Sequence, residues 1–309
     1  MIPVLRPDLP SPEELSPYLH QIYISGIASN GGPLVRELEN LLGGVAVANG
    51  TLGLELACQY AFAQKVRVPA FTFPATATAV LRAGLEVVWC DVREDTWAVE
   101  PDPQTLAVCP FGFPAEGVLV DAAGAYNIQT NGNRVVSFHA TKPLPAGEGG
   151  MVFGVEELLD HVRRAREFGR EGDVVTGQGT NAKMSEYHAA VALASLKKYP
   201  ATTEKRRDIA AHYLRNLAGT VGMRPFVGGS VFPILIDDPA GVMKALAIAG
   251  YESRRWYWPT LDLHPAFKAC KSESLPVTRR LAGRLLCLPF HTFLTTTHVD
   301  EICGVVCGC

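Results

Sequence analysis

The sequence has little that points to a membrane or to a nucleic acid. None of its apolar runs approaches the length needed to span a bilayer, and the N-terminal MIPVLRPDLPSPEEL contains no signal-peptide core. The 28 basic and 31 acidic residues leave a formal net charge of −3, without the basic excess of a typical nucleic-acid-binding protein. We therefore expect a cytoplasmic protein that binds neither membranes nor nucleic acid.

The chain also lacks a recognisable metal or disulfide motif. Its eight cysteines form no CxxC pair, and the tail CGVVCGC has no second Cys or His cluster at zinc-like spacing. Buried or terminal free thiols in a reducing compartment are the interpretation that fits this distribution. No metal ion is expected.

What is present is an alternation of short apolar runs with helical patterns. The 309 residues are 48% hydrophobic and contain no internal repeat, which fits one large domain or two unequal ones. Such alternation predicts an α/β fold with a mostly parallel sheet and helices on both of its faces. The predicted strands are 45–48, 66–70, 85–92, 105–111, 118–122 and 134–139, and the predicted helices of this part are 33–44, 49–64, 73–84, 156–169 and 184–200.

The remainder of the chain predicts an irregular arm and a smaller domain. Residues 1–30 are rich in proline and are expected to lie as an arm over the body. A charged helix over 202–219 is expected to lead into a small α+β domain with a strand at 231–237 and helices near 240–249, 277–285 and 297–305. We place the large domain at 1–205 and the small C-terminal domain at 206–309.

Lys142 stands in an unusual setting, within SFHATKPLPAGEGG. An apolar strand leads to it, and a loop rich in proline and glycine follows. A lone lysine at a strand end is most often a surface residue. Partial burial, however, lowers the pKa of an amine, and the neutral amine can form a Schiff base. We therefore treat Lys142 as a candidate anchor for a covalent cofactor.

Asp121 ends the preceding predicted strand, within VLVDAAGA. An acid at the carboxyl end of a parallel strand points toward the crevice where α/β proteins bind ligands, although it can also cap a following helix. Pyridoxal phosphate (PLP) requires a Schiff-base lysine and an acid that keeps its pyridine nitrogen protonated. Because Asp121 and Lys142 lie on consecutive strands, neighbouring strand ends could bring them together.

Two further segments suit the phosphate and the ring of such a cofactor. ANGTLG (48–53) follows a short strand and opens a helix, where free N–H groups and the Thr51 hydroxyl can bind phosphate. PAFTFPAT offers Phe71 and Phe73 as stacking faces, although a phenylalanine is more often a core residue.

The order of these segments resembles the DegT/StrS-type sugar aminotransferases, a family of fold-type-I PLP enzymes. The resemblance covers most of the chain, from about Gly26 to the last helix. It implies an aspartate-aminotransferase-like fold with a seven-stranded type of sheet. The segments that carry it are GGPLVRELENLLG, NGTLGLELA, VPAFTFPATATAV, DVREDTWAVEP, VDAAGA, SFHATKPLPAGEGG, GTNAKMSEYHAAVALASLKK, GYESRRWYWP and LPVTRRLAGRLLCLPFH.

The resemblance implies a role for each matching residue. Lys142 would form the Schiff base and move the proton, Asp121 would pair with the pyridine nitrogen, and Phe73 would stack on the ring. Thr51, Leu52 and Ser137 would hold the phosphate. Asn181 would reach the phosphate of a neighbouring subunit in a homodimer. His139, Arg254 and Tyr257 are weaker candidates for substrate contacts. The implied reaction converts a keto-sugar, usually nucleotide-linked, to an amino-sugar with L-glutamate as the amino donor.

The sequence departs from the family pattern in several places. Gly124 stands where the family usually has Gln or His, and NAKM and LDLHP replace the family's NYRM and LHxQP. Only 30 positions separate Asp91 from Asp121, where relatives carry an additional helix, and YNIQTNGNR is also short. Two alternatives therefore stand beside the aminotransferase. One is a different PLP reaction such as sugar dehydration, for which relatives replace the lysine with histidine. The other is a non-catalytic binding or regulatory relative.

Overall fold

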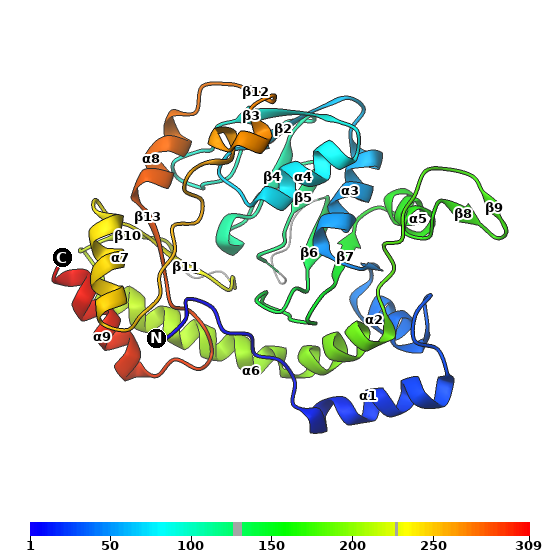
Figure 1. Ribbon diagram of the computed structural model, residues 1–309, viewed down its shortest axis with the longest axis horizontal. Coiled ribbons are helices and arrows are strands. Elements are labelled where there is room, and N and C mark those ends of the chain that lie inside the picture. Colours follow the sequence, from blue (N-terminus) through cyan, green and yellow to red (C-terminus); the bar gives the residue numbers. More distant parts are fainter. Residues whose placement is uncertain (126–131, 226–227) are drawn as a thin grey trace.

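A long helix, α6 (Glu186–Asn216), runs along the molecule and connects its two parts (Figure 1). The structure is a computed structural model that describes residues 1–125, 132–225 and 228–309. The first half of α6 packs against α1 and α2, and its second half packs against α9 in the C-terminal part. Because one helix contributes to both parts, it couples them mechanically.

The larger part is built on a mixed sheet. Five strands are neighbours in the order β1, β7, β6, β5 and β4. Three more strands pair with one another in the order β12, β3 and β2. A parallel β-bridge between Arg67 and Thr105 joins these two groups of strands. The Arg67 N–H donates to the Gln104 carbonyl at 2.8 Å. The strands are β1 (Val45–Val47), β2 (Lys65–Pro69), β3 (Glu86–Cys90), β4 (Leu106–Val108), β5 (Leu119–Asp121), β6 (Asn133–Ser137), β7 (Gly150–Phe153) and β12 (Lys271–Ser272).

Most pairs in this sheet are parallel, as predicted. Strands β4, β5 and β6 are parallel to one another, and so are β2, β3 and β12. Strand β7 is antiparallel to both β1 and β6, so β1 runs in the direction of β6. The carboxyl ends of β1, β5 and β6 therefore share one edge of the sheet.

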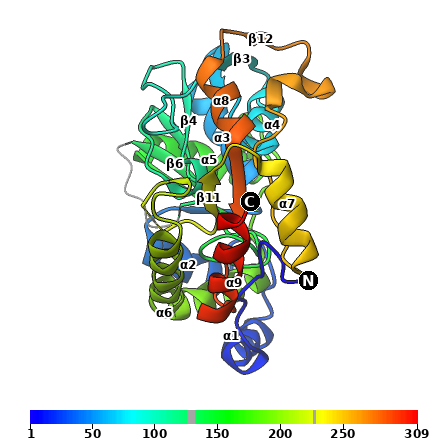
Figure 2. The same cartoon turned by 90° about the vertical axis from the view of Figure 1, so that its left-hand side faces the viewer.

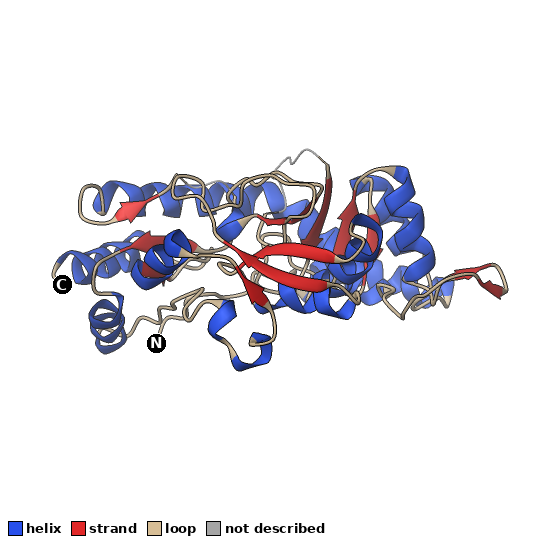
Figure 3. Ribbon diagram, turned by 90° about the horizontal axis from the view of Figure 1, so that it is seen from above, coloured by secondary structure: helices blue, strands red, loops and turns tan. Residues whose placement is uncertain are grey.

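Alternate residues of the strands bury against opposite layers. Leu106 and Leu119 belong to a core with α3, α4 and α5, whereas Ala107 and Val120 face a core with α1, α2 and the first half of α6. Figure 3 shows helices on both sides of the strands. The helices named here are α1 (Pro12–Ser25), α2 (Pro33–Leu42), α3 (Gly50–Ala61), α4 (Pro74–Arg82) and α5 (Glu156–Ala165).

The connection from β4 to β5 has no α-helix. Two adjacent parallel strands usually need a crossover of a dozen or more residues, most often helical. Here Cys109 to Val118 make the crossover with only the 3₁₀ turn η1 (Pro110–Gly112). The shortened segment between Asp91 and Asp121 thus takes the form that the sequence predicts. Residues 126–131, the first part of the other short segment YNIQTNGNR (126–134), lie outside the described residues.

The C-terminal part contains a small antiparallel sheet with helices packed on it. Strand β11 (Phe232–Leu235) pairs with β10 (Gly222–Met223) and with β13 (Leu285–Leu288). Helices α7 (Pro239–Ile248) and α9 (Thr296–Cys307) share a core with the end of α6 (Figure 2). Helix α8 (Pro276–Arg284) precedes β13, and η2 (Leu261–Leu263) and η3 (Pro265–Phe267) precede β12. The proposed domain limits, 1–205 and 206–309, stay a prediction.

Two sequence-based expectations were wrong, and some strands were not predicted. Residues 1–30 are not wholly irregular, because α1 begins after Ser11, whose hydroxyl accepts the Glu14 N–H in a capping box. The helices expected at 184–200 and 202–219 are one helix that continues through Pro200, since packing on both sides of the proline holds it together. Strands β7 and β13 were not predicted, because each follows a segment interpreted as loop or helix.

Candidate active site

Asp121 is a buried carboxylate at the carboxyl end of β5. It is 5% exposed, and its Oδ2 accepts a hydrogen bond from Thr76 Oγ1 at 2.7 Å. The Ala123 N–H donates to Oδ1 at 3.1 Å. Burial raises the pKa of Asp121, while these two hydrogen bonds and the charge of Lys142 act in the opposite direction. Such a carboxylate favours a cationic partner.

Lys142 lies in the loop between β6 and β7, near Asp121. Burial lowers the pKa of its amine, and the charge of Asp121 partly offsets that effect. The two residues follow the neighbouring parallel strands β5 and β6, and the charge of each group shifts the pKa of the other, so the side chains lie within electrostatic range of one another. The Lys142 N–H donates to the His139 carbonyl at 2.9 Å, which closes a turn at the base of the loop. The structure thus brings together the two residues on which the sequence interpretation depends.

The N-terminus of α3 adjoins the end of β6. Asn49 caps α3, and its Oδ1 accepts the Leu52 N–H at 2.9 Å. A side chain at position 50 would place its Cβ 3.0 Å from the Cβ of Ser137, so Gly50 allows the helix to approach this strand closely. The first N–H groups of a helix have no intrahelical acceptor and carry the positive end of its dipole. Thr51 and Ser137 therefore flank a place suited to an anion.

Two aromatic residues are candidates for contacts with a ligand near Asp121. Phe73 precedes α4 and is 56% exposed, which leaves its ring free for a ligand. Tyr257 stacks on Phe111 with ring centroids 5.1 Å apart and meets the edge of Phe71 at 5.3 Å. Burial raises the pKa of Tyr257, and the charge of Asp121 adds to this effect. Tyr257 thus reaches the neighbourhood of Asp121 from the C-terminal half of the chain.

The other predicted residues lie at the surface. His139 Nδ1 is 3.0 Å from Thr141 Oγ1, and its Nε2 is 3.9 Å from a Glu148 carboxylate oxygen. Arg254 is exposed and pairs with Glu252 at 2.8 Å. Apart from the backbone hydrogen bond between Lys142 and the His139 carbonyl, no hydrogen bond or ion pair joins either side chain to Asp121 or Lys142 within the described part of the chain. Their proposed roles in binding a substrate stay predictions.

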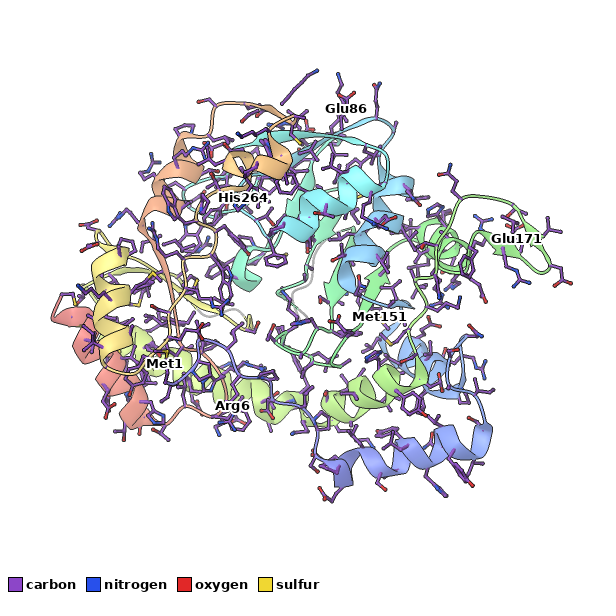
Figure 4. The ribbon with its side chains drawn as sticks, viewed as in Figure 1. Met1, Arg6, Glu86, Met151, Glu171 and His264 are labelled. Atoms are coloured by element: carbon purple, nitrogen blue, oxygen red, sulfur yellow. The ribbon has the colours of Figure 1, made fainter. Side chains whose placement is uncertain are left out.

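Asn181 is exposed and follows a hairpin that projects from the body. The hairpin consists of β8 (Arg170–Glu171) and β9 (Val174–Val175), and Glu171 near its tip points away from the core (Figures 3 and 4). Both valines of β9 are more than 60% exposed. The base of the hairpin borders a surface hollow of about 530 Å³, lined by Gln59, His161, Arg164 and Gln178 among others. None of the predicted site residues lines that hollow.

Sequence reasoning missed Thr76 and Asn49. Thr76 lies in the first turn of α4, four residues after Thr72, which precedes the helix, and the two hydroxyl oxygens are 2.9 Å apart. Asn49 is a preferred capping residue directly before a helix, so its position was a usable signal. Thr76 gave no such signal, because its partner Asp121 lies 45 residues further along the chain.

A buried acid, a lysine whose pKa is lowered by burial and a helix N-terminus lie at the carboxyl edge of one sheet, where α/β enzymes bind their ligands. The comparison with known families agrees with this class. The chain belongs to the DegT/DnrJ/EryC1/StrS aminotransferase family, whose model matches residues 12–112 and 114–307.

Similar proteins include a transaminase and solved structures with a closely related fold. The dTDP-4-amino-4,6-dideoxy-D-glucose transaminase of Escherichia coli is 29% identical over 367 residues, covering 99% of this chain and 98% of the relative. A Bacillus cereus protein assigned as a PLP-dependent aminotransferase superposes with a TM-score of 0.91 at 27% identity, covering 99% of both chains. DesI, solved in the presence of its TDP-sugar product, gives 0.90 at 29% identity, covering 100% of this chain and 92% of DesI.

The alignment with the Escherichia coli enzyme is longer than the 309 residues of this chain. The relative therefore carries insertions that this chain lacks, in agreement with the missing crossover helix between β4 and β5. In residues 1–125, 132–225 and 228–309, no helix has the length and apolar character needed to cross a membrane. The same residues contain no group of three His, Cys, Asp or Glu side chains arranged to hold a metal ion.

Proposed function

We propose that this protein is a PLP-dependent aminotransferase that converts a nucleotide-linked keto-sugar to an amino-sugar, with L-glutamate as the amino donor. The single observation that carries the proposal is the juxtaposition of the Lys142 amine and the buried Asp121 carboxylate, each shifting the pKa of the other. Family membership supports the reaction type, and the Escherichia coli relative and DesI support a nucleotide-linked sugar.

The site residues fit the cofactor. Asp121, whose burial favours a cationic partner, would face the ring nitrogen. Phe73 would stack on the ring, because its exposed side chain is free to do so. The α3 N-terminus, with the Thr51 and Ser137 hydroxyls, would hold the phosphate. The Leu52 N–H already donates to Asn49, so the N–H groups of Gly50 and Thr51 are the better donors.

Bound PLP supplies an aldehyde that reacts with amines and a protonated ring that accepts electrons. The protein supplies the base and its placement. Burial lowers the pKa of Lys142 Nζ and so favours the neutral amine, which would remove the proton from the α-carbon of the amino donor. The carboxylate of Asp121 would keep the ring nitrogen protonated, held in place by Thr76.

We also propose that two chains form a homodimer with shared active sites. Asn181 is exposed beside the projecting hairpin, whose valines are exposed although they are apolar. The backbone carbonyl of the next residue, Ala182, accepts the Ala48 N–H at 2.7 Å, just before the phosphate-binding turn. An exposed apolar hairpin beside the site is suited to a second copy of the chain, and Asn181 would then contact the partner's phosphate.

The test begins with purified protein and added PLP. We expect a near-visible absorption band that bleaches with L-glutamate as 2-oxoglutarate forms, and a mass increase on Lys142 after borohydride reduction. Lys142→Met should lose the band and the mass increase, whereas Lys65→Met, which alters an exposed lysine, should keep both. Amination is then assayed with nucleotide-linked keto-sugars, beginning with the dTDP-linked sugar that would yield the product named for the Escherichia coli relative.

The outcomes separate the alternatives. The absence of the band in the wild-type protein would refute the aminotransferase proposal. A band that bleaches with L-glutamate, together with amination of a sugar, would support it. A band without turnover of any donor or sugar would favour a binding or regulatory relative. Consumption of a sugar with loss of water and no amine transfer would favour dehydration.

A further inference from the structure

The loop that carries Lys142 is held from below by α6. Residues 143–146 are buried, and the loop closes through the Ala140 N–H to the Gly147 carbonyl at 2.9 Å and the Ala146 N–H to the Phe138 carbonyl. The carbonyl of Pro143, directly after Lys142, accepts a hydrogen bond from Arg206 Nη1 at 3.3 Å. Helix α6 passes beneath the β6–β7 loop in Figure 1.

Arg206 is an unusual residue in that position. It is 6% exposed, and within the described residues its Nε has no hydrogen-bond partner and its guanidinium has no ion pair within 4 Å. Burial lowers its pKa, and the charges of Asp8 and Tyr199 oppose that effect. A buried cation without an ion pair costs free energy, so its place under the Lys142 loop calls for a compensating role.

We propose that Arg206 is a positioning residue for Lys142, acting through its hydrogen bond to the Pro143 carbonyl. The bond holds the peptide group between Pro143 and Leu144, one peptide group beyond the one that follows Lys142, and so restricts the directions in which the lysine stem can leave the backbone. The amine is thereby kept inside the site beside Asp121. This inference rests on the proposed function, because the value of a fixed amine lies in its reaction with the cofactor and with the donor proton.

Arg206 influences Lys142 by holding the backbone of the loop rather than through the charge of its guanidinium. The pKa of Lys142 is lowered by burial and raised by Asp121, so enclosure of the amine is the larger influence. Without Arg206 the loop would be freer to move, and the amine would reach water. Its pKa would then rise toward the ordinary value of a lysine, and less neutral amine would be present near neutral pH.

The test compares Arg206→Met and Arg206→Lys with a matched control, Arg207→Met. Arg207 is the adjacent residue on the same helix and is exposed. The first readout is the rate at which the near-visible band appears after PLP is added to the apoprotein. The second is the affinity for 4-deoxypyridoxine 5′-phosphate, which has the ring and the phosphate but no aldehyde. Urea unfolding of each apoprotein confirms that the variants are folded.

We expect Arg206→Met to slow covalent attachment by roughly 10- to 100-fold, with the affinity for the deoxy analogue within about twofold of wild type. Arg206→Lys should restore part of the rate, because its ammonium can still donate to the Pro143 carbonyl. Arg207→Met should match the wild-type protein. Equal losses in attachment and in analogue binding would overturn the proposal, because Arg206 would then support the whole site rather than the lysine.

A third readout does not depend on the cofactor. Trace acetylation of the apoprotein over a pH series, followed by peptide mass spectrometry, reports the pKa of Lys142. We expect Arg206→Met to move the Lys142 profile toward alkaline pH by about one unit and Arg207→Met to leave it unchanged. An unchanged profile in Arg206→Met would overturn the proposal. If the wild-type protein forms no band, the proposed function fails, and this profile still decides whether Arg206 positions Lys142.

Discussion

Thr76 donates a hydrogen bond from its Oγ1 to Asp121 Oδ2 at 2.7 Å, and both side chains are buried. This bond lowers the pKa of Asp121, whereas burial, the larger influence, raises it. Because the folded pKa lies above the unfolded one, the contribution of Asp121 to stability is greatest below its unfolded pKa and is lost as the pH rises through its folded pKa.

Thr76→Val should therefore destabilise the apoprotein more when Asp121 is ionised. We expect a loss of about 1.5–3 kcal/mol in the free energy of unfolding near pH 8, and a smaller loss near pH 5, where more of the acid is protonated. Urea unfolding at the two pH values measures the difference. In an Asp121→Asn background the pH dependence of the Thr76→Val effect should disappear, and its persistence there would show that Asp121 is not the cause.

Glu186 should be a structural anchor rather than a catalytic acid. Its carboxylate is fully buried and accepts the N–H groups of Leu34 and Val35 at 2.8 and 2.9 Å, which caps α2 from α6. Glu186→Ala would leave both donors unsatisfied, and we expect a loss of about 3 kcal/mol in the free energy of unfolding. Glu37→Ala, an exposed change on α2, should stay within about 0.5 kcal/mol of wild type.

Gly32→Ala tests the same contact from the other side. A Cβ at position 32 would lie 2.5 Å from Glu186 Cδ, so the carboxylate would have to move away from the helix it caps. We expect Gly32→Ala to destabilise the protein in the same direction as Glu186→Ala, and the double variant to lose less than the sum of the two single losses. Additive losses, measured by urea unfolding, would mean that the residues act independently.

Phe71 and Phe73 lie two residues apart and should behave in opposite ways. Phe73 is exposed, so Phe73→Ala should change the free energy of unfolding by less than about 0.5 kcal/mol. It should weaken PLP binding by roughly 2- to 10-fold through the lost stacking contact. Phe71 is buried, and Phe71→Ala should cost about 3–5 kcal/mol of stability. Unchanged PLP affinity in Phe73→Ala would remove that residue from the proposed site.

Complementation between two inactive variants tests the shared active site. In a mixed dimer of Lys142→Met and Asn181→Ala chains, one site would have both native residues and the other would have neither. Random mixing should therefore recover about a quarter of the wild-type transaminase activity. Each variant alone is expected to be inactive or strongly impaired. Failure of the mixture to exceed the two variants alone would show that Lys142 and Asn181 serve the same chain's site.

Much of the fold and the centre of the site could be predicted from local patterns. The alternation of apolar runs and helical segments indicates a mostly parallel sheet, and the order of β1, β5 and β6 along the chain is visible in the sequence. Asp121 and the lysine loop each follow a strand, and parallel strands end at the same edge of a sheet. Their proximity therefore follows from the fold class.

The limits of helices were less predictable where the sequence contains a proline, as in α6, or is rich in proline, as in residues 1–30. Pro200 ends a helix in most local contexts, yet α6 continues because its two halves pack on different parts of the protein. Strand β7 pairs antiparallel between β1 and β6, a placement that no pattern within its four residues indicates. Both outcomes depend on neighbours that lie far away in the sequence.

The sequence by itself determined the class of fold, the acid and the lysine, because these depend on periodicity and on where strands end. Only the tertiary structure decided that Thr76 holds Asp121, that Glu186 caps α2 and that Arg206 reaches the carbonyl after Lys142. Those partners are separated by 45, about 150 and 63 positions. Local propensity extends over a few residues, whereas burial brings distant polar groups together and requires each of them to find a partner.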